Sequence, residues 1–276
     1  MIADLHVHTT HSDGTFTPEE IVDLAHNKGL NAIAITDHDT ISGIEPAIIR
    51  SQGYKNLYVI PGIEFSCTYL NEEVHILGYF IDYKLSDIIN VTKVLKEERY
   101  SRGIKIISKL NNIGINISVD EVKKNIKGSL IGRPHIGRTL IEKKYVKSME
   151  EAFNKYLGKN KPAYVERFKL ETSEAINLIH KANGLAVLAH PGLIKEKNII
   201  NDLIAQDIDG IEVIHSKHSH KDVLDNIDLA DAYGLFKTGG SDFHGDKRNG
   251  EYILGSYYVN LNHIEEMKGR IHIGKL

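Results

Sequence analysis

Short apolar runs that alternate with helical patterns constrain the fold of this chain more than any other feature. Seven runs rich in Ile, Val and Leu have the length and composition of buried strands. They lie at residues 2–8, 31–36, 57–66, 74–80, 185–190, 210–215 and 235–244. Between the first two, Thr17 and Glu20 form a capping box that starts an amphipathic helix, which Gly29 ends. Strands that are apolar on both faces and alternate with helices predict parallel pairing in an α/β fold, most simply closed as a barrel.

Residues 93–169 interrupt this alternation, because they contain helical patterns with no strand between them. We expect this stretch to be an inserted, mainly helical lobe, with the barrel assembled from residues 1–92 and 170–276. The lobe carries 19 Lys and Arg against 8 Asp and Glu, while the rest of the chain carries 15 against 29. Most of these lysines are expected on a solvated face. The alternative is a basic lobe that caps an acidic, metal-loaded core and helps to hold an anion.

Composition excludes several classes of protein. Of the 276 residues, 41% are hydrophobic and 26% are charged, which is ordinary for a globular protein. No apolar run approaches the ~20 residues of a membrane span, and the first residues lack the pattern of a secretory signal. The single cysteine, Cys67, excludes an internal disulfide. We therefore expect a cytoplasmic protein with no membrane association, and the sequence predicts no protein partner.

His6 and His8 are the first candidate metal-binding residues. On a strand, residues i and i+2 point to the same face about 6.8 Å apart, so both imidazoles could reach one metal ion. A single such pair is a modest signal, because a strand histidine is more often a hydrogen-bonded core residue. Further imidazole and carboxylate groups at or beside the ends of predicted strands strengthen the case for a metal site. These are Asp37, His38, Glu64, His75, His190, Asp242 and His244, and Asp13 follows the first strand closely.

The carboxyl ends of strands in parallel α/β folds meet at one mouth, so these residues are expected to converge. Buried without partners they would cost several kcal/mol, whereas divalent cations satisfy imidazoles and carboxylates together. Ligands of this kind without a thiolate suit Zn, Mn or Fe, and do not separate the three. Of the carboxylates beside His38, Asp37 is expected to orient a ligand imidazole and Asp39 to cap the following turn.

The segments DLHVHTTHSDG, ITDHD, GIEFS, HILGYF, GRPHI, AHPG and GSDFH resemble the PHP family, the polymerase and histidinol phosphatase superfamily. The likeness runs over nearly the whole chain. It implies a distorted (β/α)7 TIM-like barrel with a trinuclear metal centre at the strand ends. The segment RPHI within a helical insertion is similar to a branch of small phosphoesterases that act on nucleotides. That branch includes 3′,5′-nucleoside bisphosphate phosphatases and 5′-exonucleases of short oligonucleotides.

The resemblance also implies roles for individual residues. Two of the metal sites would share Glu64, and a third would lie beside them. The implied ligands are His6, His8, Glu64 and Asp242 for the first site, Glu64, His75 and His190 for the second, and Asp13, His38 and His244 for the third. Arg133, His135 and His218 would be the catalytic and substrate-binding residues that contact phosphate. For the last of these, the segment HSKHSH offers three histidines, and we prefer His218.

These residues predict a metal-dependent phosphoesterase with two to three divalent ions. Closely spaced ions lower the pKa of a shared water toward ~7, and the resulting metal-bridging hydroxide can attack phosphorus in line. Arg133 can present two donors to a phosphate, and His135 could bind phosphate or protonate the leaving group. We expect a small anionic nucleotide as substrate, most simply a nucleoside 3′,5′-bisphosphate hydrolysed to the 5′-monophosphate and phosphate.

Several alternative functions remain open at this stage. The same ions could serve a 5′-3′ exonuclease on a short oligonucleotide, a cyclic-nucleotide phosphodiesterase or a histidinol phosphate phosphatase. A non-catalytic metal-binding accessory module is the alternative from another class. It is disfavoured because none of the nine implied ligands is missing from this chain.

Overall fold

The structure, a computed structural model, describes residues 1–125 and 131–273. Its strands are β1 (Ile2–Val7), β2 (Ala32–Ile35), β3 (Tyr58–Tyr69), β4 (Glu72–Tyr79), β5 (Leu170–Glu171), β6 (Leu185–Leu188), β7 (Gly210–His215), β8 (Phe236–Gly240), β9 (Lys247–Arg248), β10 (Glu251–Tyr252) and β11 (Val259–Asn260). Its helices are α1 (Pro18–Asn27), α2 (Ile44–Ser51), α3 (Ser86–Asn112), α4 (Val119–Lys124), α5 (Arg133–Glu142), α6 (Met149–Ala152), α7 (Thr172–Lys181), α8 (Ile199–Ile204), α9 (His220–Tyr233) and α10 (Leu261–Ile273), with a π-helical turn η1 (Phe153–Leu157) and a 3₁₀ turn η2 (Pro191–Leu193). Each of the seven predicted runs contains a strand.

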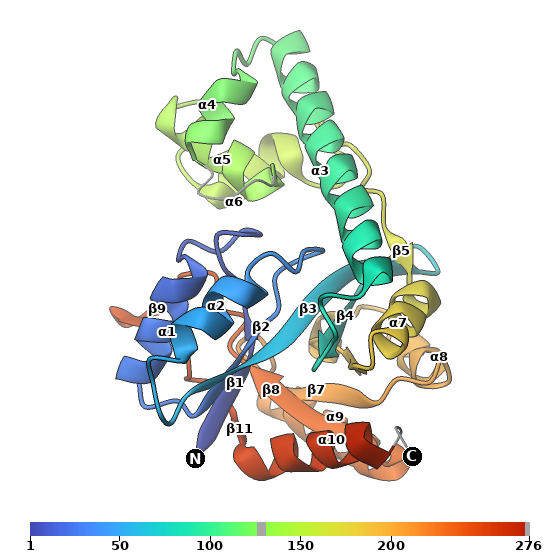
Figure 1. The fold of residues 1–276 in the computed structure, drawn as a ribbon. Helices are drawn as coiled ribbons and strands as arrows, with labels where there is room; N and C mark the ends of the chain where they lie inside the picture. The colour runs from blue at the N-terminus through green and yellow to red at the C-terminus, as the bar shows by residue number, and fades with distance from the viewer. Residues whose placement is uncertain (126–130, 274–276) are drawn as a thin grey trace.

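The main sheet curls into a nearly closed barrel (Figure 1). Its strands follow the order β11-β1-β2-β3-β4-β6-β7-β8. The carboxyl end of β1 meets the segment after β8, where the His8 N–H donates to the Phe243 carbonyl oxygen at 3.0 Å. At the other end of β1, the short β11 pairs with Ile2 and Ala3. The predicted distorted (β/α)7 TIM-like barrel is therefore confirmed as the fold class.

The prediction of parallel pairing is wrong for β4. It pairs antiparallel with β3 on one side and with β6 on the other. The cause is the turn between β3 and β4, where Leu70 and Asn71 have φ angles of 48° and 66°. Two residues with positive φ make a tight hairpin turn, which leaves no chain for a crossover to a parallel strand. Because β4 is also buried on both faces, its composition did not reveal its direction.

Two apolar clusters hold the barrel together. Alternate strand residues fill the interior: Ala3, Leu5, Ala32, Ala34, Leu77, Tyr79, Leu185 and Val187, with Ile264 and Met267 of α10 against them. The other face of the strands packs against outer helices such as α1 and α7. The Thr17–Glu20 capping box of α1 is confirmed by hydrogen bonds in both directions. Since α10 covers the amino ends of the strands, the opposite end of the barrel is left for the site.

Helices α3 to α6 extend away from the barrel (Figure 1). They have an apolar cluster of their own, which includes Ile106 and Leu110 of α3 and Ile136 and Leu140 of α5. The early part of α3 contributes Ile88 and other residues to the barrel core instead. The predicted boundary at residue 93 thus falls inside one continuous helix, and the division into barrel and lobe stays a prediction. Residues 126–130 and 274–276 of the predicted units lie outside the described residues.

Asp4 ties the ends of the barrel together beneath the site. Its carboxylate is fully buried and accepts hydrogen bonds from the Ser241 N–H, the Ser241 hydroxyl and the Gly255 N–H at 2.6–2.9 Å. Burial raises the pKa of Asp4 to about 6 despite these donors. The bonds join β1 to the segment after β8, so they hold His6 close to Asp242 in the closed barrel.

Within the described residues, 1–125 and 131–273, no helix has both the length and the apolarity needed to cross a bilayer.

Candidate metal and phosphate site

Five imidazoles surround the carboxylate of Glu64, which is 1% exposed. Its Oε2 atom lies 3.2 Å from His6 Nε2, 3.2 Å from His8 Nε2 and 3.0 Å from His38 Nδ1. Its Oε1 atom lies 2.7 Å from His75 Nδ1 and 3.1 Å from His190 Nε2. The two oxygens therefore face two different sets of ring nitrogens, as a shared ligand of two metal ions would.

Glu64 and His75 lie at a different place in their strands from the one expected. Both lie inside the β3–β4 hairpin, where Ser66 pairs with His75 and Glu64 with Leu77, rather than at the carboxyl ends of parallel strands. The hairpin is longer than the other strands of the barrel, so its distal half passes beside the mouth. Mid-strand residues of the hairpin thus meet the strand-end residues of β1 and β6.

A second group lies beside His8. The ligand atoms of His8, Asp13, His38 and His244 all lie within 4.8 Å of one another. His244 Nε2 is 3.1 Å from Asp13 Oδ1. The other ring nitrogen of His244, Nδ1, donates to the Asp242 carbonyl oxygen at 2.9 Å, so Nε2 is the nitrogen that faces the group.

Asp242 links the two groups. Its Oδ1 atom lies 3.2 Å from His8 Nε2 and 3.6 Å from His6 Nε2, and its Oδ2 atom lies 3.3 Å from His215 Nε2. The backbone of Asp242 has a φ of 54°, in the left-handed region that non-glycine residues rarely adopt. Strain of this kind concentrates at functional sites, where the surrounding structure holds it.

The residues present fit a set of cations. Several buried ligand atoms have no hydrogen-bonding partner within the described part of the chain, although other ligand atoms lie close by. They include His6 Nε2, His8 Nε2, Asp13 Oδ1, Glu64 Oε2 and His75 Nε2. Unpaired polar atoms are costly to bury, and a divalent ion satisfies converging nitrogen and oxygen lone pairs together. The structure thus brings together all nine predicted ligands, and these residues could hold metal.

Charge within the site displaces the pKa values of its residues. Burial alone would raise the pKa of Glu64, but the surrounding imidazoles, His38 foremost, lower it well below its usual value. Burial alone would lower the pKa values of His75 and His244. The neighbouring carboxylates raise them instead, to about 9 for His75 and about 10 for His244. Both imidazoles therefore hold protons that a metal ion must displace.

Two buried residues of β7 were not chosen as site residues from the sequence: Glu212 was not considered, and His215 was one of the three histidines of HSKHSH from which we preferred His218. Glu212 accepts from His6 Nδ1 at 3.0 Å, and His215 Nε2 faces Asp242. Regular alternation would put residues 212 and 215 on opposite faces of a strand. The pairing with β8 shifts register between Glu212 and Ile214, so Val213 is an extra residue that brings both side chains to the same side. For Glu212, the repeated placement of acidic and imidazole groups at predicted strand ends was the only signal in the sequence.

His218 occupies a different position from the one predicted. Its Nδ1 donates to the Val213 carbonyl oxygen at 3.0 Å, and its Nε2 accepts from the Gly192 N–H at 3.2 Å. Both ring nitrogens are thus engaged within the protein, which argues against a contact with phosphate. His215 has the suitable arrangement, because its Nδ1 accepts from the Lys217 N–H at 3.1 Å and its Nε2 faces the site.

Asp37 and Asp39 also differ from their expected roles. Asp37 accepts from the Thr9 N–H, the Thr9 hydroxyl and the Ser12 hydroxyl, so it orders the segment after β1 rather than an imidazole. Asp39 does not cap a turn. Its Oδ1 accepts from the Ser66 N–H at 2.9 Å, and its Oδ2 pairs with Arg99 and Arg167.

Five cationic side chains of residues 93–169 lie near one another beside the nine predicted ligands, which we call the metal cluster below. Arg99 donates to the His38 carbonyl oxygen at 2.9 Å, and Lys169 pairs with Glu73, which lies 3.5 Å from His75 Nε2. Burial lowers the pKa of Arg102 to about 10, and the charges of Arg133 and Arg99 add to this effect. The set is Arg99, Arg102, Arg133, Arg167 and Lys169.

Arg133 and His135 both lie in the first turn of α5. The Arg133 guanidinium stands over the Phe153 ring at 5.3 Å and donates to the Leu157 carbonyl oxygen at 3.5 Å. His135 is 3% exposed, and its Nδ1 accepts from the Gly132 N–H at 3.0 Å. This bond puts the ring proton of a neutral His135 on Nε2, where it can act as a donor.

Comparison with known proteins identifies the family. The PHP domain matches residues 4–187. The chain belongs to the PHP family. It is 35% identical over 252 residues to the 5′-3′ exoribonuclease Rnm of Escherichia coli K12, covering 88% of this chain and 85% of that protein. It is 32% identical over 256 residues to a 3′,5′-nucleoside bisphosphate phosphatase of Chromobacterium violaceum, covering 91% and 90%.

A solved PHP-like structure has the same fold. It is that of a proposed metal-dependent phosphoesterase of Bifidobacterium adolescentis, which matches with a TM-score of 0.88 and 27% identity over 97% of this chain and 96% of that chain. The expected resemblance is thus confirmed, and this PHP protein is a metal-dependent phosphoester hydrolase. The reading as a non-catalytic accessory module is set aside.

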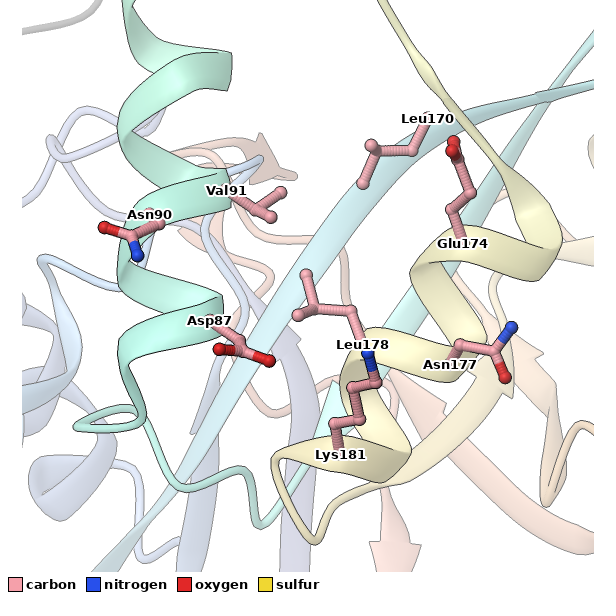
Figure 2. A pocket seen from close by; sticks show the side chains of 8 residues that line it. All are labelled: Asp87, Asn90, Val91, Leu170, Glu174, Asn177, Leu178 and Lys181. Carbon is pink, nitrogen blue, oxygen red and sulfur yellow. The ribbon is translucent and has the colours of Figure 1, made fainter.

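A separate cavity of about 500 Å³ lies between α3 and α7. Figure 2 shows Val91, Leu170 and Leu178 around it, with Asp87 and Lys181 at its edge. None of the predicted site residues lines it. We therefore assign the chemistry of this PHP protein to the strand ends and not to this cavity.

The site predicts how the stability of the metal-free protein depends on pH. Above pH 6.5 the unfolded chain loses its histidine protons, whereas folded His75 and His244 keep theirs until about pH 9 and about pH 10. Their contribution to stability is complete below pH 6.5 and is lost as pH rises through these values. Urea denaturation in the presence of a chelator should give a lower free energy of unfolding at pH 9.5 than at pH 7. A matched series with His244→Asn should show a shallower decline, and a flat wild-type profile would contradict the assignment.

Proposed function

We propose that this PHP protein removes the 3′-phosphate from nucleoside 3′,5′-bisphosphates and leaves a nucleoside 5′-monophosphate. The observation that carries the proposal is the surplus of positive charge beside the metal cluster. Among the residues that the structure describes, the five cationic side chains defined above form ion pairs with two carboxylates, Asp39 and Glu73, so they carry three more positive charges than these partners offset. Sites of one sign concentrate ligands of the other. One phosphate at the ions and a second at the cations fit a bisphosphate.

In this proposal, the buried pair Arg99 and Arg167 makes the protein selective for a substrate with a second phosphate. Arg99 and Arg167 have side chains that are 12% and 11% exposed and share the single carboxylate of Asp39. Burial lowers the pKa of Arg167 to about 10, which reflects the cost of keeping this charge out of water. An anion that accepts from both guanidinium groups would offset that cost. Residues 93–169 would then act as a basic lobe that caps the site.

The metal ligands are proposed in the three sets that the family resemblance implies, and the contacts around Glu64 and Asp13 support them. The sets are His6, His8, Glu64 and Asp242; Glu64, His75 and His190; and Asp13, His38 and His244. Two to three divalent ions held there would polarise the phosphate and lower the pKa of a water toward ~7. Zn, Mn and Fe all suit these ligands.

The chain's own groups would bind the phosphate. Because the Nδ1 of His215 accepts from the Lys217 N–H, the proton of the neutral ring lies on Nε2, from which it can donate a hydrogen bond to a phosphate oxygen or to the departing oxygen. Lys217 Nζ lies 3.3 Å from Asp242 Oδ2 at the mouth, where it can meet a phosphate oxygen. Arg133 and His135 would hold the distal phosphate from the first turn of α5. His215 thus takes the role predicted for His218.

A second candidate function is 5′-3′ exonuclease activity on short oligonucleotides. A groove of about 770 Å³ is lined by Lys159, Tyr164, Phe168 and Lys195, together with Arg167 from the arginine pair. Basic and aromatic side chains in one groove are typical of single-stranded nucleic acid sites. Three carboxylates, Glu72, Glu73 and Glu166, also line the groove, which makes it less attractive to a long anionic chain.

The choice between the two candidates rests on relative rates. Wild-type protein loaded with Mn²⁺ should release phosphate from adenosine 3′,5′-bisphosphate faster than mononucleotides from a 5′-phosphorylated tetranucleotide. Cyclic nucleotides, 5′-monophosphates and histidinol phosphate complete the panel, because each lacks one of the two phosphates. Phosphate release followed with a coupled assay and nucleotides separated by chromatography give the ranking. Faster release of mononucleotides would make the protein an exonuclease.

Arg133→Ala tests the distal phosphate contact. Loss of a charge-assisted hydrogen bond should lower kcat/KM for the bisphosphate by roughly 10- to 100-fold while metal content stays unchanged. The control is Arg50→Ala, which removes an exposed arginine paired with Asp23 on the outer helices. Metal analysis and initial rates measure both effects. Equal kcat/KM for the two variants would remove Arg133 from the proposal.

Substitutions of His215 and His218 can distinguish their roles. His215→Asn should lower kcat by roughly 100-fold, the range expected for loss of a hydrogen-bond donor to charge that develops in the transition state, with unchanged metal content. His218→Asn should mainly lower stability, because its two hydrogen bonds join Val213 to Gly192. Kinetics normalised to the folded fraction distinguish the two. A larger loss of kcat in His218→Asn would restore the prediction made from the sequence.

A further inference from the structure

Glu212 is a carboxylate buried beneath the metal cluster with both oxygens in use. It is 0% exposed and lies in β7. Its Oε1 atom accepts from His6 Nδ1 at 3.0 Å, and its Oε2 atom accepts from the His190 backbone N–H at 2.8 Å. A single carboxylate thus touches two predicted ligands, one in β1 and one just after β6.

The first contact decides which nitrogen of His6 faces the cluster. A carboxylate only accepts hydrogen bonds, so His6 must carry a proton on Nδ1. The lone pair then lies on Nε2, which is 3.2 Å from Glu64 Oε2 and 3.6 Å from Asp242 Oδ1. A histidine that ligates a metal is commonly oriented in this way by an acceptor on its other nitrogen.

The second contact holds a strained backbone. His190 has φ 28° and ψ 59°, a conformation that non-glycine residues rarely adopt. Its N–H donates to Glu212, and its ring nitrogen Nε2 lies 3.1 Å from Glu64 Oε1. Without the carboxylate the peptide would be free to relax, and the imidazole would move with it.

Glu212 is not well placed as a ligand itself. A ligand atom from each of His6, Glu212 and His215 lies within 4.8 Å of the others, which is close enough for a cation. However, both carboxylate oxygens already accept from N–H donors. A cation at this point would have to displace the His6 proton that directs Nε2 toward Glu64.

We infer that Glu212 is a positioning residue that sets ligands of both metal sites bridged by Glu64. The inference rests on the proposed metal ligands. A Gln side chain at this position has one acceptor and one donor group, so it cannot serve both His6 and His190 as acceptor. E212Q should therefore weaken metal binding at both sites although it removes no ligand.

The test compares E212Q with a matched buried carboxylate. Asp209 lies just before β7 and accepts from the Ala186 N–H at 2.8 Å, and its Oδ2 is also 2.8 Å from His180 Nε2. It thus has the same kinds of partners, but its contacts involve none of the predicted ligands. Zn²⁺ affinity of chelator-treated full-length protein, measured by competition with a chromogenic chelator, should fall 10- to 100-fold in E212Q and stay within about threefold in D209N.

The second readout is spectroscopic and needs no variant. In wild-type protein loaded with Zn²⁺, long-range ¹H–¹⁵N correlations of labelled histidine should show His6 protonated on Nδ1 and unprotonated on Nε2. The opposite protonation would overturn the inference even if E212Q failed to fold. Wild-type affinity in E212Q, or an equal loss in D209N, would overturn it as well. Failure of wild-type protein to bind Zn²⁺ would instead reject the proposed metal ligands, and the inference with them.

Discussion

The site depends on one buried carboxylate, Glu64, whose two oxygens face two sets of imidazoles. A charged carboxylate that is 1% exposed is stable only with compensating charge around it. The five surrounding histidines provide that compensation in the metal-free state, and protons are retained on some of them. This explains why the pKa of His75 is raised while the pKa values of His38 and His190 are lowered. The same balance means that metal binding and proton release are coupled.

The barrel provides this arrangement by combining two kinds of strand. Parallel strands bring His8, His190 and Asp242 to a common mouth, where each follows directly after or close behind a strand end. The β3–β4 hairpin then passes beside that mouth and supplies Glu64 and His75 from mid-strand. Strained backbone at His190 and Asp242 turns the chain at these points. The strain is held by specific acceptors, of which Glu212 is one.

The sequence predicted the barrel and the side chains that gather at its mouth, because strands and strand ends leave local patterns. His6 and His8 follow from strand alternation, and the apolar runs give the strands themselves. The direction of β4 depended on a two-residue turn, and the joint orientation of Glu212 and His215 depended on one extra residue at Val213. Neither leaves a clear periodic signal. Contacts such as Asp39 with Arg167 join positions 128 residues apart and cannot be read from spacing.

The distribution of charge connects the fold to the choice of substrate. The metal cluster would cancel the charge of one phosphate in any phosphoester, so the ligands alone cannot distinguish a bisphosphate from an oligonucleotide. In the function that we propose, discrimination comes mainly from residues 93–169, whose buried Arg99 and Arg167 share one acidic partner. Asp39, that partner, follows His38 directly and also accepts from the Ser66 N–H, so the cationic pair is fixed to the metal cluster rather than to a separate body. A substrate with two phosphates at the matching separation would engage both ends at once, and a substrate with one phosphate would leave the arginine pair uncompensated.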